Sequence, residues 1–537
     1  MADVQYFNQA QQFLLAMNTR DEIAVCGRGF GKGAVQAGRL LTGVQGMPGS
    51  SGGFVAPSVK RCLTNILPSM LIHLERWGYK RDLHYIVGRK PWKALHWKQP
   101  YFQPANWENT IAFYNGAVCN IISQDRTGTS NSMSLDYLIM DEAKFLDPDQ
   151  LRNETFPANR GNQTLFGKFF MHHGMTITSD MPITKKGSWF LKYQEEMNPE
   201  LVSSVWFVCR KIRTIKKRMA LSTAETMRLA GELAQWRSVL NNMRRDCLLY
   251  VEFSTLENID LLGEDFIRRM KRELSPQTFN TAILNKRIRV AKDGFYGALD
   301  EDINLYTAPD IAYLDNMRYD FDKLRKEDCR MDSDLDGSLP LFVAFDANSN
   351  FNCVCVGQPK NGKLRVLKSF FAKYDRKLNE LVDDVCEYYK WHKLKLIVFY
   401  YDATFKGTVT GIKANELYVI VETAFRRNKW MVTSKFIGRP MNHVEKNLLI
   451  NNMLKGKARH QVLINRDNNE DLIISIESAE VVNGKKDKSG EKEVEPDEDL
   501  LQHRTDFSDA FDTLCIGVEL FPVYGLVGSD SVNVYPR

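Results

Sequence analysis

The chain has 537 residues, of which 44% are hydrophobic, so it is long enough for about two to four domains with real cores. Charged residues make up 26%, which excludes a disordered or wholly membrane-embedded chain, and the net charge of +6 is only a weak indication of a polyanionic partner. No apolar run approaches the ~20 residues that span a bilayer, and the N-terminus has no signal-peptide pattern. Ten cysteines at scattered spacings indicate free thiols in a reducing compartment. The expectation is a soluble, intracellular protein.

A glycine-rich turn near the N-terminus follows a helical pattern over 1–22 and a short apolar strand over 23–25. The turn reads Cys-Gly-Arg-Gly-Phe-Gly-Lys-Gly, and a helical pattern runs from Lys32 to Val44. Strand, glycine loop, lysine and helix in this order are typical of a P-loop, in which backbone N–H groups and the helix N-terminus bind phosphate. Lys32 would reach the terminal phosphates as a point charge. The residues expected to bind the nucleotide are Gly27, Arg28, Gly29, Phe30, Gly31, Lys32 and Gly33.

The turn departs from the standard pattern at two positions. Cys26 stands where a glycine is usual, and Gly33 stands where a serine or threonine normally ligates Mg²⁺. A glycine-rich turn that binds no nucleotide is therefore an alternative that the octapeptide alone leaves open.

A loop is predicted over 47–53, a strand over 54–57 and a helix over 58–77. An Asn-Gly turn between 111–113 and 118–122 predicts a hairpin, and the polar segment 124–134 predicts a surface loop.

An apolar strand over 135–140 delivers two carboxylates, Asp141 and Glu142, at its end. This is typical of a Walker B site, where Asp141 would hold Mg²⁺ and Glu142 would orient the attacking water. Capping of a helix N-terminus by the same two residues is the alternative. A further strand over 175–182 contains Thr178 and Ser179, at a strand end that lies near the γ-phosphate in P-loop motors.

The rest of the first half is expected to contain a strand over 202–208, a helix over 222–245, a strand over 247–253 and helices to residue 285. Six basic residues between Arg210 and Arg218 indicate either a solvated helix face or a contact to the DNA backbone. Residues 295–336 have the composition of a linker, rich in aspartate.

A second pattern follows. A strand over 341–345 ends at Asp346, with antiparallel partners over 352–357 and 364–370, and a strand over 396–401 ends at Asp402. Helices are predicted over 377–391 and 441–454, and the charged run 484–499 is expected to be a hairpin or loop. The last helix opens near residue 506 and carries Asp506 and Asp509 on one face.

Carboxylates at neighbouring strand ends repel one another unless divalent cations bridge them, and two such cations clamp an in-line attack on a phosphodiester. Asp346, Asp402, Asp506 and Asp509 are therefore candidate metal ligands of a two-metal nuclease. A strand-end turn or helix cap is the alternative for each one taken singly. Asp509 is the expected main ligand of the last pair, with Asp506 as an auxiliary.

Taken together, these motifs resemble the large terminase subunit of tailed bacteriophages over residues 5–520. The resemblance is carried by Arg28 and Lys32 in the loop, by Asp141-Glu142-Ala143, by the Thr178-Ser179 turn, and by Asp346, Asp402 and Asp506-x-x-Asp509-Ala510. It implies an α/β fold: a P-loop NTPase domain with a mostly parallel sheet over 1–300, with a helical lobe at about 210–290, and a ribonuclease H-like nuclease domain over 337–525. Residues 301–336 would be the linker and 526–537 a tail.

The resemblance implies a packaging motor that uses ATP with Mg²⁺, and an endonuclease that uses two divalent cations, Mg²⁺ or Mn²⁺, and cuts concatemeric DNA. Glu142, Arg28, Asp346, Asp402 and Asp509 would be catalytic, Thr178 and Ser179 would couple hydrolysis to movement, and Arg126 is a candidate trans-acting arginine finger. The implied partners are double-stranded DNA, the portal protein, a small terminase subunit and further copies in a ring, expected to be a pentamer. The implied location is the host cytoplasm, with transient docking on the procapsid portal and no place in the mature virion.

Two other classes of function stay open at this point. One is a repair or recombination helicase-nuclease, although the further arginine-bearing motifs of such helicases are missing. The other is a nucleotide-gated nuclease with a weak ATPase, which Gly33 favours.

Overall fold

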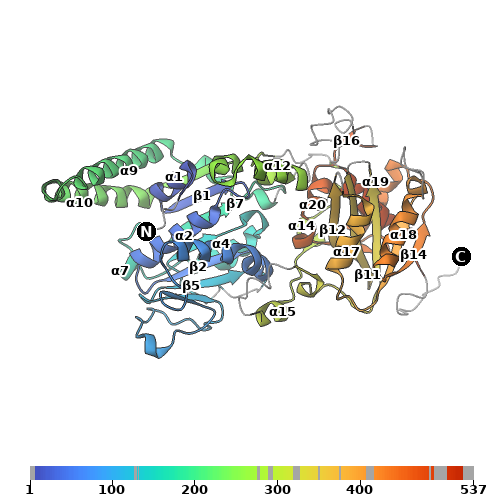
Figure 1. Cartoon of the computed structure of the whole chain (residues 1–537), viewed down its shortest axis with the longest axis horizontal. Helices are drawn as coiled ribbons and strands as arrows, with labels where there is room; N and C mark the ends of the chain where they lie inside the picture. Colours follow the sequence, from blue (N-terminus) through green and yellow to red (C-terminus); the bar gives the residue numbers. More distant parts are fainter. Residues whose placement is uncertain are drawn as a thin grey trace. The chain divides into compact units, whose positions relative to one another are not determined.

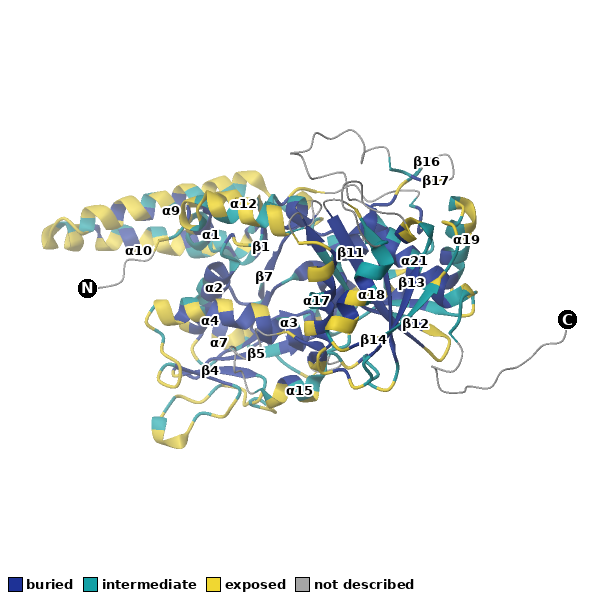
Figure 2. Cartoon of the chain, turned by 45° about the vertical axis from the view of Figure 1, so that its right-hand side comes forward, coloured by how far each residue is buried: buried dark blue, intermediate teal, exposed yellow. Residues whose placement is uncertain are grey.

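The structure is a computed structural model, and it describes residues 6–125, 130, 132–184, 186–274, 278–287, 294–317, 327–348, 351–373, 376–406, 416–482, 485–488 and 505–523. The chain divides into two compact units, each with its own sheet (Figure 1). The first is formed mainly by Met1–Arg268, and the second mainly by Arg289–Asn316 and Lys326–Arg537. In both units the strands are largely buried (Figure 2).

The described part of the first unit contains an 8-stranded sheet in the order β3-β4-β5-β2-β6-β7-β1-β8. The strands are β1 (Asp21–Cys26), β2 (Ser51–Ala56), β3 (Tyr85–Val87), β4 (Thr110–Phe113), β5 (Val118–Ser123), β6 (Tyr137–Met140), β7 (Gly174–Ser179) and β8 (Leu248–Phe253). Neighbours from β5 to β8 pair in parallel, whereas β3, β4 and β5 form the antiparallel hairpins at one edge. The strand before the glycine loop and the strand before Asp141 are thus separated by β7.

Helices cover both faces of this sheet. Those of the first unit are α1 (Gln9–Met17), α2 (Lys32–Gly46), α3 (Val59–Arg61), α4 (Leu67–Arg76), α5 (Pro148–Gln150), α6 (Phe156–Ala158), α7 (Gln163–Phe166), α8 (Tyr193–Glu196), α9 (Pro199–Met219), α10 (Thr223–Asp246) and α11 (Ile259–Leu262). Helix α12 (Glu264–Glu273) begins in the first unit, and its residues from Arg269 belong to the second. One core cluster joins α1, α9 and α10 to β1 and β8, and a second lies between β1, β2, β6 and β7 and the segment after Asp141. Figure 1 shows α9 and α10 side by side as a two-helix arm.

The predicted strand over 202–208 is wrong, because these residues lie inside α9. Asn198 caps the helix by accepting from the N–H groups of Glu200 and Leu201, and Pro199 occupies its first turn. The buried residues of α9 recur at helical spacing and pack against α1 and α10: Val205, Val208, Ile212 and Ile215. This packing outweighs the β preference of the valines, which is a weak and context-dependent signal.

Other predicted elements hold with shifted ends. The first helix covers only Gln9–Met17, because Asn18 adopts a left-handed conformation that ends it. The predicted loop over 47–53 is shorter, because β2 already begins at Ser51. The 111–122 hairpin is confirmed as β4 and β5.

The described part of the second unit contains a 7-stranded sheet in the order β14-β13-β10-β11-β12-β15-β9. The strands are β9 (Leu305–Tyr306), β10 (Leu341–Ala347), β11 (Phe351–Lys360), β12 (Lys363–Lys373), β13 (Leu396–Tyr401), β14 (Met431–Phe436) and β15 (Gln461–Asn465). Strands β10, β11 and β12 form an antiparallel meander, and β13 and β14 continue from β10 in parallel. This order is that of a ribonuclease H-like sheet.

Successive side chains along a strand of this sheet point to opposite faces, and each face packs into its own hydrophobic core. Cys353 and Cys355 point to one face, as their spacing predicts, and Val354 and Val356 point to the other. Helices α19 (His443–Leu454), α20 (Glu470–Glu477) and α21 (Asp506–Leu520) cover the cysteine face, while α17 (Leu378–Tyr388) and α18 (Leu417–Arg427) cover the valine face.

The described residues of the expected linker are built into the second unit. Phe295 and Tyr296 are buried in its core. The segment then forms α14 (Glu301–Asn304), β9 and α15 (Ile311–Asn316), and β9 pairs with β15 at the sheet edge. Linker composition therefore did not exclude folded structure here. The domain boundaries at 300, 337 and 525 stay predictions.

Both units are α/β, with a mostly parallel sheet in the first and a mixed sheet in the second, each packed against helices, so the predicted α/β class is confirmed. Among the described residues, no helix combines the length and the apolar character needed to cross a membrane.

Candidate functional site

The glycine loop between β1 and α2 is held from outside by side chains that bind its carbonyl groups. Nδ2 of Asn258 donates to Gly29 O (2.7 Å), and the hydroxyl of Thr255 donates to Arg28 O (2.7 Å). From α1, Nε2 of the buried Gln11 donates to Phe30 O (3.0 Å) and Gly31 O (3.2 Å). Four consecutive carbonyls are therefore fixed.

Peptide planarity then orients part of the loop. In a trans peptide the N–H of the next residue points opposite to the carbonyl, so the outward carbonyls of Arg28, Phe30 and Gly31 direct the N–H groups of Gly29, Gly31 and Lys32 inward. The N–H groups of Gly27, Arg28 and Phe30 instead donate to backbone carbonyls, those of Phe253, Ala282 and Gly27. Gly29 (φ +88°) and Gly31 (φ +91°) hold left-handed conformations that a side chain rarely adopts. The loop then opens directly into the N-terminus of α2, which favours negative charge.

Lys32 and three carboxylates meet beside this loop. The Nζ of Lys32 donates to Cys26 O (3.0 Å). Burial alone would lower the pKa of Lys32, but the charges of Glu142, Asp180 and Asp141 together raise it. Lys32 is therefore positively charged and surrounded by carboxylates. A phosphate-binding lysine in a site without its ligand would be in the same state.

Asp141 and Glu142 follow β6 as predicted. Asp141 is buried, and its Oδ1 accepts from the hydroxyl of Thr178 (2.7 Å). Glu142 adopts a left-handed conformation (φ +52°), and its buried Oε2 has no hydrogen-bond partner among the described residues. Burial and the neighbouring Asp180 raise the pKa of Glu142. A strained glutamate with an unused oxygen and a raised pKa suits an acceptor of a proton from water.

The Thr178-Ser179 strand end lies between the two phosphate-site strands. Thr178 pairs with Ala24 of β1 in register, and its hydroxyl also accepts from Nε2 of Gln36 on α2 (2.8 Å). The Ser179 hydroxyl accepts from the N–H of Lys144 (3.2 Å). Thr178 thus connects Asp141 of the β6 end to Gln36 of α2.

Asp180 is a site residue that the sequence analysis did not select. Its carboxylate pairs with Nε of Arg28 (3.1 Å) and with Nζ of Lys144 (2.9 Å), and it is fully buried. Its position directly after Thr178-Ser179 was the only signal in the sequence. Gln11 was missed for a similar reason, because nothing in its surroundings in the sequence marks it as part of the clamp.

Gly33 is explained by close packing. A Cβ at Gly33 would lie 2.3 Å from the hydroxyl oxygen of Ser69 on α4, and 3.1 Å from Ser69 backbone atoms. Gly27 is likewise enclosed, since a Cβ there would meet Thr255 Oγ1 at 2.5 Å and Ile283 O at 2.6 Å. Ser69 therefore fills the space that a side chain at position 33 would need.

The residues of this site fit a nucleotide with Mg²⁺. The clamped loop and Lys32 would hold the phosphates, Asp141 would hold the cation directly or through water, and Glu142 offers its unpartnered oxygen. Arg126, the candidate trans-acting finger, lies outside the described residues.

The second candidate site lies at the C-terminal ends of β10 and β13. These strands are parallel, with Ala344 opposite Tyr400 in the last observed pair, and Asp346 and Asp402 each follow two residues later. Alternation directs both toward the face that α21 covers, because Ala344 and Tyr400 belong to that core. Asp402 also accepts from the N–H (2.9 Å) and hydroxyl (2.5 Å) of Thr404, so it caps the turn that follows β13.

Asp506 and Asp509 open α21 on the same side. Burial, then the charges of Asp506 and Asp509, raise the pKa of Asp346 well above its ordinary value. Asp506 is buried and accepts from Nδ2 of Asn348 (2.9 Å), just beyond β10. The structure therefore brings Asp346 close to both aspartates of the helix.

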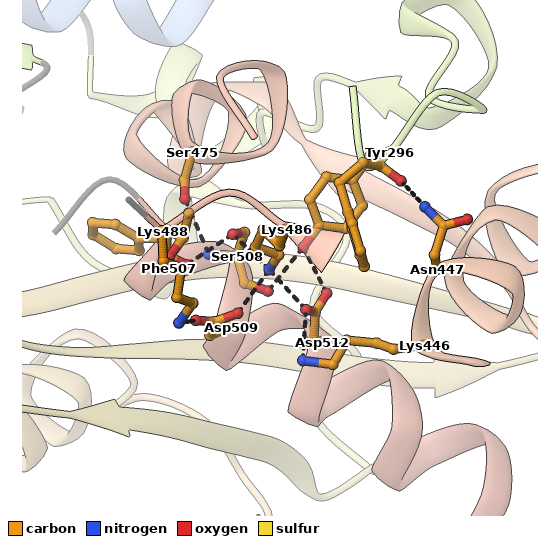
Figure 3. Close-up of polar contacts among 12 residues, drawn as sticks. Tyr296, Lys446, Asn447, Ser475, Lys486, Lys488, Phe507, Ser508, Asp509 and Asp512 are labelled. Atoms are coloured by element: carbon orange, nitrogen blue, oxygen red, sulfur yellow. Dashed lines mark hydrogen bonds and ion pairs between the residues drawn. The ribbon is translucent and has the colours of Figure 1, made fainter. Parts of the chain in front are cut away.

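Two lysines form ion pairs with the carboxylate of Asp509 (Figure 3). The Nζ of Lys486 lies 2.7 Å from its Oδ1, and Lys488 binds its Oδ2. Lys486 is fully buried and also binds Asp512 (2.8 Å) and the Ser508 hydroxyl (3.0 Å). It lies in β17 (Lys485–Lys486), which pairs with β16 (Val481–Val482). Of the charged run 484–499 the structure describes only residues 485–488, so the hairpin or loop expected over the run stays a prediction. Lys486 in this run is a buried ion-pair partner.

Asp512 is a further residue that the sequence analysis did not select. It accepts from the hydroxyl of Tyr296 (2.7 Å), and Lys446 of α19 lies 3.3 Å away (Figure 3). Its spacing of three from Asp509 was visible in the sequence, but its burial was not.

The fit of this second site to divalent cations is partial. Among the described residues, no three histidine, cysteine, aspartate or glutamate side chains form a ready metal-binding group. Asp346 and Asp506 carry the mutual repulsion that a cation would relieve, whereas the charge of Asp509 is already neutralised by Lys486 and Lys488.

No family model and no curated protein matches this chain. Solved structures do. The large terminase of a thermophilic bacteriophage, in complex with ADP, is 13% identical, with 96% of this chain and 100% of that chain covered and a TM-score of 0.36. The ATP-gamma-S complex of the same terminase is 13% identical, with 94% and 98% covered and a TM-score of 0.35.

A match confined to part of the chain is Thermus thermophilus RuvC, at 14% identity, with 33% of this chain and 93% of that chain covered and a TM-score of 0.18. Over nearly its whole length, then, this chain is similar to large terminases of bacteriophages.

Proposed function

We propose that this protein is a DNA-packaging motor, in which ATP hydrolysis drives double-stranded phage DNA through a portal into a procapsid. The observation that carries the proposal is the clamped glycine loop, with its carbonyls fixed outward beside Lys32, Asp141 and the unpartnered oxygen of Glu142. An anion cradle with a buried lysine and a raised-pKa carboxylate is what phosphoryl transfer to water requires. Thr178 would pass the state of this site to the rest of the unit.

The second unit supplies the other half of the proposal, an endonuclease that cuts concatemeric DNA. Asp346, Asp402 and Asp506 would hold the divalent cations, Mg²⁺ or Mn²⁺, and Asp509 would join them once Lys488 releases it. Bound cations would stabilise the attacking and leaving oxygens of the phosphodiester. The shared register of β10 and β13 and the approach of α21 support this set.

The partners follow from this function and belong to the same proposal. They are double-stranded DNA, a portal protein, a small terminase subunit and further copies of this chain in a ring, with Arg126 as a candidate finger between neighbours. The setting would be the cytoplasm of an infected bacterium, with transient docking on the procapsid.

A translocation assay tests the motor against the helicase alternative. The full chain is given ATP, Mg²⁺ and a duplex that carries a bound third strand. Displacement of the third strand without separation of the duplex is the expected result. Separation of the duplex strands would favour a helicase-nuclease, and absence of DNA-stimulated ATP hydrolysis would favour the nucleotide-gated nuclease.

A further inference from the structure

The connection between β3 and β4, residues 88–109, has a composition unlike the rest of the surface. It holds three of the nine tryptophans of the chain, with a tyrosine and a phenylalanine: Trp92, Trp97, Tyr101, Phe102 and Trp107. Arg89 and Lys90 precede these aromatics, Lys93 and Lys98 stand between them, and Glu108 is the one carboxylate. Long connections without much secondary structure of their own are usually functional in compact domains.

The connection is held in place against the β4–β5 hairpin. The N–H of Lys98 donates to Tyr114 O (3.2 Å), and the N–H of Tyr101 donates to Gly49 O (2.9 Å). The hairpin turn is so close that a Cβ on Gly116, at φ +85°, would lie 2.6 Å from Gln99 O. This surface is therefore a built feature of the first unit.

A cavity of about 450 Å³ lies between the connection and the hairpin. It is lined by Trp92, Trp97 and Trp107, by Lys90, Lys93 and Lys98, and by Phe113 and Val118 of the hairpin. This volume lies within the usual range of about 300–1,000 Å³ for small-ligand sites. Indole faces and ammonium groups thus share one hollow.

Three of the five rings are half exposed or more, although exposure of such large apolar groups is unfavourable, and Trp97 and Trp107 are partly buried. Trp92 is 50% exposed, Tyr101 56% and Phe102 50%. The guanidinium of Arg89 lies 4.4 Å from the centroid of the Trp92 ring, which shows that a cation can sit on this face. Figure 2 shows the region beside β4 as largely exposed chain.

We propose that this surface, the residue 88–109 platform, binds single-stranded DNA by stacking unpaired bases on its tryptophans. Aromatic faces that alternate with cations are the means by which proteins hold single strands, since every base has a face to stack and every nucleotide a phosphate. Paired bases inside a duplex cannot reach such rings, so duplex DNA would use only the cations. The platform goes beyond the proposed motor, which moves duplex DNA, and provides a place for an unpaired stretch such as a DNA end.

Fluorescence anisotropy with a labelled oligothymidylate of about 12 nucleotides tests this, because single-strand sites cover about 4–16 nucleotides. The full chain is used with EDTA and without ATP, so that failure of either enzymatic activity does not affect the result. The oligothymidylate should bind at least about tenfold more tightly than an abasic oligonucleotide of the same length, which has the same phosphates and no bases. Binding should also quench tryptophan fluorescence.

Tryptophan variants test whether the oligothymidylate binds at the residue 88–109 platform. Trp92→Ala with Trp97→Ala should weaken oligothymidylate binding at least about tenfold and remove its advantage over the abasic strand, while Trp92→Phe should preserve both. Trp391→Ala is the matched control, because Trp391 is 53% exposed in the second unit. Trp92→Ala alone, at a half-exposed position, tests the same effect if the double variant does not fold.

Three outcomes would overturn the proposal. Equal affinity for the base-containing and abasic strands would show a phosphate contact only. Equal weakening of duplex and single-strand binding in the tryptophan variants would show a duplex surface. No oligonucleotide binding at all would favour an acidic protein segment as the occupant.

Discussion

The Nζ of Lys486 lies 2.7 Å from Oδ1 of Asp509 and holds a buried cation against an expected metal ligand. Lys486 also pairs with Asp512, so one lysine compensates two aspartates of α21 (Figure 3). This arrangement makes the ion pairs part of the fold as well as part of the candidate nuclease site. It leads to two separate predictions, one on stability and one on cation binding.

Lys486→Met should destabilise the chain by about 3–5 kcal/mol, because it removes the fully buried cation that Asp509 and Asp512 share. Only the partly exposed Lys488 would then pair with Asp509, and only Lys446, 3.3 Å away, with Asp512. The measurement is denaturant unfolding of the full chain, followed by a probe in the second unit. Lys485→Met, at the exposed neighbour in the same strand, is the matched control and should change stability little. A loss below about 1 kcal/mol for Lys486→Met would contradict the structural role of the ion pairs.

Lys488→Gln should lower the Mn²⁺ concentration needed for half-maximal plasmid cleavage by about tenfold, a factor that corresponds to about 1.4 kcal/mol in binding. Lys488 is partly exposed and binds one oxygen of Asp509, so its removal frees that oxygen for a cation while the buried Lys486 stays. An unchanged Mn²⁺ requirement would show that Asp509 is not a cation ligand. In that case, Asp506→Asn should abolish cleavage, whereas Asp509→Asn should leave cleavage near normal.

Gly33→Ser should impair ATP hydrolysis, because its Cβ would overlap the Ser69 hydroxyl, 2.3 Å away. The double variant with Ser69→Gly should recover activity, since it restores the space and moves the hydroxyl back to the loop. The readout is the Mg²⁺ dependence of ATP turnover for both variants and for Ser69→Gly alone. Unimpaired turnover in Gly33→Ser would mean that α4 moves away easily and that the packing explanation is wrong.

Glu22 in β1 makes stability depend on pH. Burial raises its pKa to about 7, against the partial opposition of Arg39, and neither carboxylate oxygen has a hydrogen-bond partner among the described residues. A folded state that holds this proton to a higher pH than the unfolded state is stabilised at low pH, and the contribution is lost between about pH 4.5 and 7. Glu22→Gln should flatten the stability–pH profile over that interval in denaturant titrations of the first unit. A slope that persists in Glu22→Gln would assign the pH dependence to other groups.

The sequence predicted those parts of the fold that local patterns determine. The glycine loop, the strands that end at Asp141 and Asp346, and the 111–122 hairpin each rest on a turn or a strand with a distinct residue type at its end. The prediction of a strand over 202–208 was wrong because it gave more weight to the β preference of three valines than to two helical signals. These signals are the Asn198-Pro199 helix start and the helical spacing of Val205, Val208, Ile212 and Ile215.

The sequence predicted charged residues of the two candidate sites but not the uncharged residues that hold them in place. The clamp by Gln11, Thr255 and Asn258 arises from segments far apart in the chain, and amide side chains of this kind carry no motif. Lys486 belongs to a charged run whose composition predicts solvated surface. It is buried because β17 pairs with β16 and places its side chain against Asp512 of α21. Long-range packing of this kind leaves no local trace in the sequence.

The account as a whole depends on two separate sites in one chain, and a crossed pair of variants tests that most directly. ATP turnover and Mn²⁺-dependent plasmid cleavage are measured on Lys32→Ala and on Asp346→Ala, both in the full chain. Lys32→Ala should lose ATP turnover and keep cleavage, and Asp346→Ala should keep turnover and lose cleavage. Normal ATP turnover in Lys32→Ala, or normal cleavage in Asp346→Ala, would contradict the account.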